Sequence, residues 1–319
     1  MAMKSLRIVK IDPADYVHVL KKTATDVQFH HVYASVKYHL EERLNDVQLT
    51  VYRIENNQPR DDQFFGLLHL QLGDSLKLLI NTNSREPDFV RSATRLFHST
   101  IHPILVNYTS YYNYLIRDDI HNYTNEYFRE HPSHPFTPMD EPNVQFYATD
   151  DQCADLIKQN IELADGYKFI DLTEEAAVQI CQDQLYTTAA DEKYIALQIR
   201  NLGAVGAVHE ETGALACYEY LDGLGTISLL YCQPEHRSKG LATAVEKKIS
   251  QTHLKKHGIR PFKGVSINRP RVIAMSQLSS LWTEVKAPDV LSTDKDTYEI
   301  YYCTARSKID KPKVVIYEN

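Results

Sequence analysis

The feature that most constrains the fold is the stretch YCQPEHRSKGLATAVEKKIS, residues 231–250, in which a strand leads almost directly into a helix. Pro234 ends the strand, and a helix is predicted over residues 238–257, with Gly258 as its stop signal. Because the first N–H groups of a helix have no partners inside it, those of residues 237–242 are predicted to point out of the turn. The chain is therefore expected to place a cluster of backbone donors at one point.

This turn has the chemistry of an anion-binding site. Gly240 has no side chain to block an approaching phosphate, and Ala242 has only a methyl group. Arg237 and Lys239 add positive charge to that of the helix N-terminus. The patterns G-x-x-x-x-G-K-[ST] and G-x-G-x-x-G are absent, so the turn is neither of these nucleotide loops. It suits a pyrophosphate, and the alternative is that Gly240 belongs to an ordinary helix start.

The rest of the second half has a regular order of elements. Strands are predicted at 167–173, 203–210, 214–222, 226–233, 263–268 and 297–307, and helices at 173–184, 190–201 and 269–281. The short turns TG and DGLG between the three central strands predict an antiparallel meander.

The first half, residues 1–143, is predicted to form a separate mixed α/β domain. Helices are expected at 12–22, with Asp12 as N-cap, at 32–44 and at 88–99, and strands at 47–54, 66–72 and 76–82. The tyrosine-rich stretch 107–138 ends in prolines, and its end is a candidate linker. Both halves order helices, then three strands, then a helix, which hints at duplication. A chain of 319 residues is long enough for two domains, here 1–143 and 165–319 with 144–164 as a connecting segment.

Charge and composition exclude several classes of protein. A net charge of −7 and a pI near 6.1 argue against nucleic acid as the main partner. There is no run of 18 apolar residues and no export signal, so we expect a soluble intracellular protein of the cytoplasm or mitochondrial matrix, without a membrane span. The cysteines lack a C-x-x-C pair and are expected to be reduced: Cys153, Cys181, Cys217, Cys232 and Cys303.

No metal site is predicted. His121, His131 and His134 lie in the tyrosine-rich stretch, but no carboxylate or cysteine accompanies them at ligand spacing. Solvated polar side chains are the favoured interpretation of these histidines.

The order of elements around the R-x-x-G-x-A turn is that of the GCN5-related N-acetyltransferase (GNAT) superfamily, and HRSKGLA resembles its acyl-CoA-binding signature. More narrowly, residues 167 to about 285 resemble the carboxyl-terminal domain of the glycine N-acyltransferase-like family. The matching stretches are YKFIDLTEEAAVQI, GAVHEETGALACYEYLD, LLYCQPEHRSKGLATAVEKK and GVSINRP. The resemblance implies an α/β protein with a GNAT fold over 165–319, and we interpret 1–143 as a GNAT-like half that lacks the cofactor loop.

The resemblance also implies acetyl-CoA or another acyl-CoA as co-substrate, with no metal. Backbone amides of six residues would hold the pyrophosphate: Arg237, Ser238, Lys239, Gly240, Leu241 and Ala242. The strand edge at Tyr231 and Cys232 would pair with the pantetheine arm, as in strand addition. Asn268 would lie near that arm, although an asparagine at a strand end is equally a common turn residue.

Amide synthesis from a thioester needs a proton acceptor and donors to the oxyanion. A backbone N–H at Tyr231 or Cys232 is a candidate donor, and for the Cys232 thiol a core role is favoured over nucleophilic attack. The relatives carry a glutamate eleven residues before the motif arginine. Here that position is Thr226, whose hydroxyl cannot accept a proton near neutral pH.

Other groups could take the role of the missing glutamate. Glu219 on the preceding strand is a candidate base, as are His209 and Glu210 before it. Each is equally interpreted as a solvated charge at a strand edge.

The sequence thus predicts an acyl-CoA-dependent N-acyltransferase acting on a small amine or amino acid. Two alternatives remain: a non-catalytic acyl-CoA-binding or scaffold protein, and a protein-lysine acetyltransferase. An acidic lining of the site would favour a cationic amine, whereas an arginine facing the thioester would favour an amino-acid carboxylate.

Overall fold

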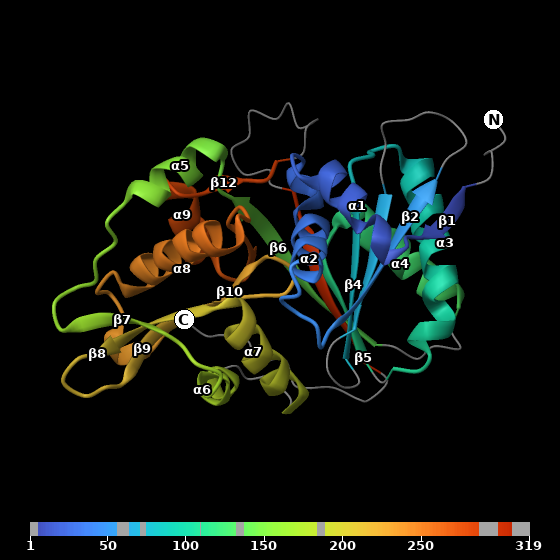
Figure 1. Ribbon diagram of the computed structural model, residues 1–319. Helices are drawn as coiled ribbons and strands as arrows, with labels where there is room; N and C mark the ends of the chain where they lie inside the picture. Colours follow the sequence, from blue (N-terminus) through green and yellow to red (C-terminus); the bar gives the residue numbers. More distant parts are fainter. Residues whose placement is uncertain are drawn as a thin grey trace. The chain divides into compact units, whose positions relative to one another are not determined.

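The computed structural model describes residues 6–55, 64–70, 75–108, 110–131, 137–183, 189–286 and 299–307 (Figure 1). The chain forms two compact units, one of Met1–Asn143 with Glu299–Asn319 and one of Val144–Tyr298. Two segments differ from the domains expected from the sequence. Residues 144–164, expected as a connection, belong to the second unit, and residues 299–319, expected to end the second domain, belong to the first.

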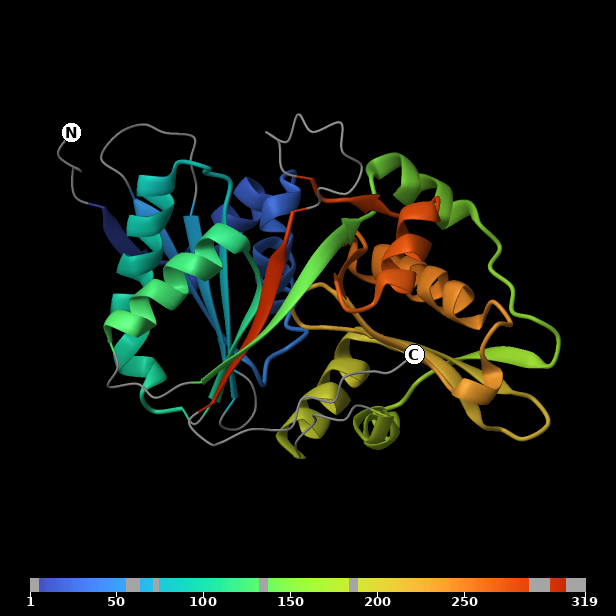
Figure 2. The ribbon, with the colours of Figure 1, turned by 180° about the vertical axis from the view of Figure 1, so that it is seen from behind.

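The last strand explains the second difference. β13 (Tyr301–Ser307) pairs antiparallel with β5 (Ser110–Arg117) on one side and with the start of β6 (Thr137–Tyr147) on the other. Figure 2 shows β13 as the red strand beside the green β6. This pairing joins segments far apart in the chain, which local sequence patterns do not reveal.

The first unit contains a mixed sheet with the strand order β1-β2-β3-β4-β5-β13-β6. Its remaining strands are β1 (Arg7–Lys10), β2 (Gln48–Glu55), β3 (Phe64–Leu70) and β4 (Ser75–Thr82). The first four strands are antiparallel, and β4 pairs in parallel with β5.

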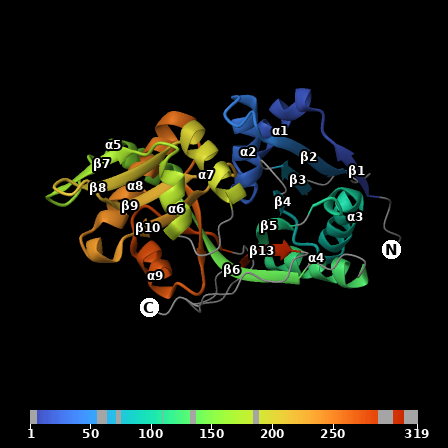
Figure 3. The same ribbon diagram turned by 90° about the horizontal axis from the view of Figure 1, so that it is seen from below.

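The helices of the first unit cover both faces of this sheet. α1 (Tyr16–Thr23) and α2 (His30–Leu40) lie on one face, and α3 (Pro87–Leu105) and α4 (Asp118–Glu130) lie on the other (Figure 3). Short 3-10 turns, Pro13–Asp15 and Val27–Phe29, precede α1 and α2. The predicted N-cap is confirmed, because the Asp12 carboxylate accepts a hydrogen bond from the N–H of Ala14. Apolar side chains of α3, such as Phe97, pack on Phe64 and Leu78 of the sheet.

The tyrosine-rich stretch contains two elements that the sequence analysis did not predict, β5 and α4. The strand pattern of β5 is irregular, because Leu115 has a left-handed φ of 45° and the register with β13 shifts there. The end of the stretch, where a linker and His134 were expected, lies at residues 132–136, outside the described residues. His121 is buried and stacks on Tyr302, with 4.0 Å between ring centroids. Within the described ranges no group of three or more potential ligands could hold a metal.

The second unit contains an antiparallel four-stranded sheet with the order β10-β9-β8-β7. Its elements are α5 (Asp150–Lys158), β7 (Tyr167–Asp171), α6 (Ala176–Asp183), α7 (Ala189–Leu202), β8 (Ala204–His209), β9 (Leu215–Leu221), β10 (Ile227–Cys232), the 3-10 turn Pro234–His236, α8 (Leu241–His257), β11 (Phe262–Ser266), α9 (Pro270–Leu278) and β12 (Thr283–Glu284). The predicted meander of β8, β9 and β10 is confirmed. In Figure 1, α8 lies on one face of this sheet and α6 and α7 lie on the other. β11 and β12 pair with β6 instead.

The two units repeat one order of elements: strand, two helices, three strands, helix, strand, helix, strand. They differ in the connection between the third central strand and the next helix, which is β4 to α3 in the first unit and β10 to α8 in the second. In the first unit, α3 begins at Pro87 with Glu86 as its N-cap, so one N–H is missing and a carboxylate stands at the helix start. In the second unit, α8 begins after Gly240. Only the second connection has the chemistry of an anion cradle.

Among the described residues, no helix combines the length and apolar character needed to cross a bilayer.

Candidate functional site

Strand β10 has a hydrogen-bonded neighbour on one side only. It pairs with β9 and, among the described strands, forms the edge of the four-stranded sheet. Its register shifts between Ser228 and Tyr231, so that Leu229 and Leu230 stand opposite the single residue Glu219. Leu229 has a left-handed φ of 59°. A bulge of this kind takes backbone groups out of the ladder, so β10 presents unpaired groups at an open edge.

The register also indicates which residues of β10 turn their backbone outward. The N–H of Gln233 donates to the carbonyl of Ala216 at 2.8 Å, so these two residues form a hydrogen-bonded pair. Hydrogen-bonded and non-hydrogen-bonded pairs alternate along antiparallel strands. The preceding pair, Cys232 with Cys217, is therefore non-hydrogen-bonded. The backbone N–H and C=O of Cys232 consequently face the open edge, whereas those of Tyr231 face β9.

The turn after β10 is a concave cluster of backbone donors, which we call the nest. Ser238 and Gly240 have left-handed φ angles of 62° and 76°, whereas Arg237 has a φ of −70°. Alternation between right-handed and left-handed backbone conformations makes successive N–H groups converge on one point. The positive end of the α8 dipole lies there as well. In the part of the chain that the structure describes, no residue accepts a hydrogen bond from the N–H groups of residues 238–242. A Cβ atom built on Gly240 would meet no other atom within 4 Å. The nest is open and suited to an anion.

A side-chain clasp, formed by Tyr167, His236 and Lys239, holds the nest against the start of β7. The Tyr167 hydroxyl accepts a hydrogen bond from Lys239 Nζ at 2.7 Å and contacts His236 Nδ1 at 2.8 Å. The Lys239 ammonium also lies 5.2 Å from the centre of the Tyr167 ring, and the His209 ring packs on the same tyrosine. The clasp fixes His236 and Lys239, which lie on either side of Arg237 and the left-handed Ser238. Its contacts are non-local, so sequence reasoning missed the role of Tyr167.

Arg237 and Asn268, two of the residues implied for cofactor binding, have backbone N–H groups that already donate hydrogen bonds within the chain. The N–H of Arg237 donates to the carbonyl of Pro234 at 3.3 Å, and its Nε donates to the carbonyl of Cys232 at 3.0 Å. Arg237 thus braces the turn through its side chain, and its amide is engaged, unlike the other five. Asn268 is exposed after β11, and its N–H donates to Ser266 Oγ at 3.3 Å.

The face of the sheet covered by α6 and α7 carries a polar group of residues next to the bulge. The Asp183 carboxylate accepts hydrogen bonds from the Tyr218 hydroxyl and from Gln233 Nε2, each at 3.1 Å. Tyr231 packs on Tyr218 with 5.7 Å between ring centroids. Asp183 was not singled out from the sequence, because an aspartate at a helix end is common and its partners are more than thirty residues away.

The opposite face holds a buried charge network of Glu219, Glu246, Lys263 and Trp282. Lys263 forms an ion pair with Glu246, which also accepts a hydrogen bond from Trp282 Nε1 at 3.0 Å. The Lys263 ammonium lies 4.4 Å from the centre of the Trp282 ring. Glu219 is only 2% exposed, and its Oε2 has no hydrogen-bond partner among the described residues. Burial raises the pKa of Glu219 well above its ordinary value, the neighbouring Glu246 raises it further, and Lys263 opposes the rise.

The buried position of Glu219 bears on its candidate role as a base. A carboxyl group whose pKa is raised in this way is shifted toward its protonated form. Because Glu219 is also buried, an amine in solvent has no direct access to it.

The structure places the catalytic candidate Thr226 in the interior. Thr226 is 2% exposed at the start of β10, and its hydroxyl has no hydrogen-bond partner among the described residues. Its carbonyl accepts a hydrogen bond from the N–H of Asp222 at 2.8 Å, which closes the turn between β9 and β10.

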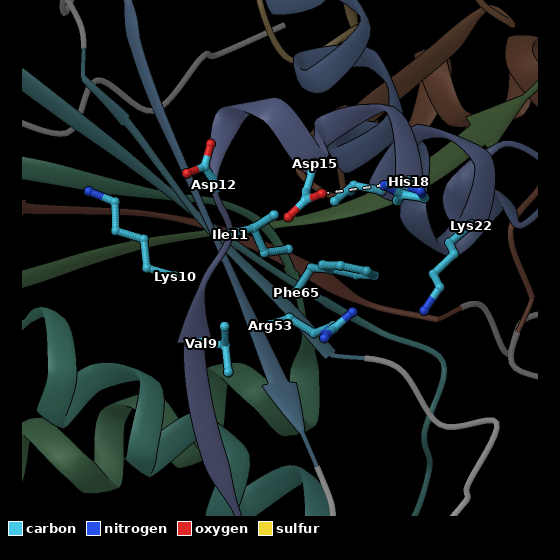
Figure 4. A pocket seen from close by; sticks show the side chains of 10 residues that line it. Val9, Lys10, Ile11, Asp12, Asp15, His18, Lys22, Arg53 and Phe65 are labelled. Atoms are coloured by element: carbon cyan, nitrogen blue, oxygen red, sulfur yellow. Dashed lines mark ion pairs between the residues drawn. The ribbon is translucent and has the colours of Figure 1, made fainter.

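A hollow of about 460 Å³ lies on the first unit and has a different character (Figure 4). Ile11 and Phe65 lie at its floor, and charged side chains of both signs surround it, including Lys22, Arg53 and Asp15. Arg53 is engaged by Glu55. Mixed charge of this kind does not select an anion such as pyrophosphate.

Comparisons with known proteins agree with the fold. A family model described as FR47-like protein matches residues 204–275, from β8 to α9. A Drosophila protein solved by a structural genomics consortium is 11% identical, with a TM-score of 0.73 over 94% of this chain and 98% of that one. A tandem GNAT protein from the clavulanic acid biosynthesis pathway is 14% identical, with a TM-score of 0.52 over 97% of this chain and 100% of that one. A putative acetyltransferase from Pyrococcus horikoshii is 12% identical, with a TM-score of 0.52 over 99% and 94%. No curated protein matches.

These likenesses concern the fold, because the identities are low. The chain has the mixed α/β fold of the GNAT proteins. The repeated order of elements in its two units agrees with a tandem arrangement.

The raised pKa of Glu219 predicts a specific pH dependence of stability. The folded chain retains a proton that the unfolded chain releases above about pH 4.3, so the contribution of the neutral acid is fully present below that pH and is lost as pH rises through the folded pKa. From about pH 4.3 up to the folded pKa, the folding equilibrium constant should fall by up to roughly tenfold per pH unit for this one proton. Glu219→Gln should remove that component in denaturant titrations at each pH, and the exposed Glu210→Gln should not. Equal slopes for the wild type and Glu219→Gln would contradict the assignment.

The environment of Thr226 predicts opposite effects for two substitutions. Thr226→Val replaces a buried hydroxyl without a partner by a methyl group of similar shape, so the melting temperature should stay the same or rise. Thr226→Glu would bury a longer ionisable side chain and should destabilise the chain by about 2 kcal/mol or more. Thermal unfolding of the two variants measures both effects. A stable Thr226→Glu variant with raised acylation activity would show that this position opens to a catalytic site.

Proposed function

We propose that the second unit binds an acyl-CoA and transfers its acyl group to the nitrogen of a small amine or amino acid. The observation that carries this proposal is the nest, in which five consecutive backbone N–H groups lie at the end of an open-edged, bulged strand. A helix N-terminus with converging amides suits a pyrophosphate. The GNAT fold, whose solved examples include acetyltransferases, supports the same reading.

The open edge of β10 supplies the partner for the rest of the cofactor. The pantetheine arm carries two amides, and it would pair with the strand edge in the manner of an added strand. The backbone of Cys232 faces this edge, with its carbonyl already bonded to Arg237 Nε, and the backbone of Tyr231 faces β9. We therefore assign the pairing to the N–H of Cys232 and to the bulge residues rather than to Tyr231. The acyl group would then lie at the bulge, where Leu229 and Leu230 offer backbone groups as oxyanion donors.

The chemistry proposed for this site is direct transfer. The lone pair of a neutral amine attacks the carbonyl carbon of the thioester, the carbon–sulfur bond breaks, and coenzyme A leaves as a thiolate that ends with the proton of the amine. We assign the role of base to neither Thr226, whose hydroxyl is buried, nor Glu219, which is buried and has a pKa shifted toward its protonated form. The reaction rate should therefore increase toward alkaline pH as the fraction of neutral amine grows.

The acceptor we favour is a cationic amine rather than an amino-acid carboxylate. The Asp183 carboxylate lies on the α6 and α7 face, together with Tyr231 beside the bulge, and it can attract an ammonium group to that face. The side-chain amine of a lysine, which is the acceptor of a protein-lysine acetyltransferase, has the same charge as a small cationic amine. The narrower likeness to the glycine N-acyltransferase-like family remains part of the proposal.

We further propose that the protein acts in a reducing compartment, the cytoplasm or the mitochondrial matrix. The five cysteines are free thiols in the structure, as is typical of proteins that are not exported.

The nest predicts opposite outcomes for two substitutions in one turn. Gly240→Val places a β-branched side chain at a left-handed φ, beside the amides that would hold the phosphates, so acetyl-CoA binding should be lost. Ser238→Gly keeps every N–H and suits a left-handed φ, so it should retain binding. In thermal-shift titrations the wild type should gain about 2.7 kcal/mol at a hundredfold excess of ligand over its dissociation constant.

A screen of acyl-CoAs against amines, with detection of the released thiol, separates the candidate functions. Binding without turnover of any amine would favour a non-catalytic acyl-CoA-binding protein. No thermal shift with any acyl-CoA would contradict both readings.

A further inference from the structure

Two cysteines stand directly opposite each other where β10 meets the nest. Cys232 on β10 and Cys217 on β9 are Cα partners in the antiparallel register, so their side chains lie on the same face of the sheet. Their pair is non-hydrogen-bonded, as the bond between Gln233 and Ala216 in the next pair requires. The Cα atoms of such a pair are about 4.5 Å apart, inside the range of roughly 4.4–6.8 Å that a disulfide spans.

The two thiols face each other across the strand pair, and their surroundings are unequal. Cys217 is fully buried, whereas Cys232 is partly exposed. Interaction with the Cys217 thiol lowers the pKa of the Cys232 thiol, burial and Glu235 oppose this, and the positive charges of Arg237 and Lys239 lower it further. Interaction with the Cys232 thiol and burial raise the pKa of Cys217.

This division of roles is that of an attacking and a resolving cysteine. The thiolate is the nucleophile in thiol–disulfide exchange, so the partly exposed Cys232 is the one able to attack an incoming reagent. Cys217 is buried directly opposite Cys232, so it can complete the reaction from inside the sheet.

We propose that Cys232 and Cys217 are a redox-active pair. They form a disulfide bond with each other, reversibly, by exchange with a low-molecular-weight disulfide. The Cys232 thiolate attacks one sulfur of the reagent RSSR, forming a Cys232–SR mixed disulfide and releasing RS⁻. The Cys217 sulfur, losing its proton to the released thiolate, then attacks the Cys232 sulfur and displaces the second RS⁻, which is protonated by solvent. Two cysteine thiols are oxidised by two electrons, and one RSSR is reduced to two RSH.

The thiol exchange does not depend on acyl transfer, although the backbone of Cys232 is also assigned to the cofactor. The position of Cys232 at the open edge of β10 gives the first step access from solvent.

The test is differential alkylation of the full chain after incubation with oxidised glutathione. No lysine or arginine lies between Arg200 and Arg237, so trypsin releases both cysteines in one peptide, residues 201–237. Oxidation of the pair makes this peptide two hydrogen atoms lighter and blocks alkylation of both thiols. Dithiothreitol should restore alkylation. A wild-type peptide that is alkylated at both cysteines, or that keeps a glutathione adduct without an internal bond, would overturn the proposal.

Two variants and a control separate the steps. In Cys217→Ala the resolving thiol is missing, so a stable glutathione adduct should accumulate on Cys232. In Cys232→Ser no adduct should form on the buried Cys217. Cys153→Ser serves as the matched control, because Cys153 is also partly buried but burial raises its pKa, and the internal bond should form as in the wild type. An internal bond that depended on Cys153 would contradict the assignment.

Discussion

The candidate site depends on the one-sided pairing of β10. A strand with neighbours on both sides would use all its backbone groups within the sheet, but β10 pairs with β9 alone among the described strands, and β11 pairs with β6 instead. The bulge at Leu229 and the outward-facing backbone of Cys232 follow from the same pairing. The nest follows the strand after one short turn, Pro234–His236, so that an open strand edge and a cluster of amide donors lie close together in the chain.

The two units differ in a local feature that bears on the proposed binding of an anionic cofactor. Both repeat the same order of elements. In the first, however, the helix after the central strands opens with Glu86 and Pro87, which add a negative charge and remove a donor. In the second, Ser238 and Gly240 take left-handed conformations that turn the amides together. Both units place a helix after the central strands, and the turn before that helix is what would supply the proposed binding chemistry.

Sequence reasoning succeeded where the signal is local. The meander β8 to β10, the cap at Asp12 and the glycine turn before α8 each follow from neighbouring residues, and the structure has them. It failed where distant segments decide: β13 inserts between β5 and β6, Asp183 meets Tyr218, and Tyr167 clasps the nest. The burial of Glu219 and Thr226 was likewise not predicted. The alternation of residues along a strand separates two faces but does not show which of them is buried. For the same reason two cysteines fifteen residues apart gave no hint that they are direct cross-strand partners.

The most direct measurement is site-resolved amide hydrogen exchange with and without acetyl-CoA. The account predicts slower exchange for the amides of residues 238–242 when the ligand is present, because phosphate oxygens would then accept their hydrogen bonds, and no change at residues 86–90 at the start of α3. Unchanged exchange in the nest at saturating ligand, or protection at the start of α3 instead, would contradict it.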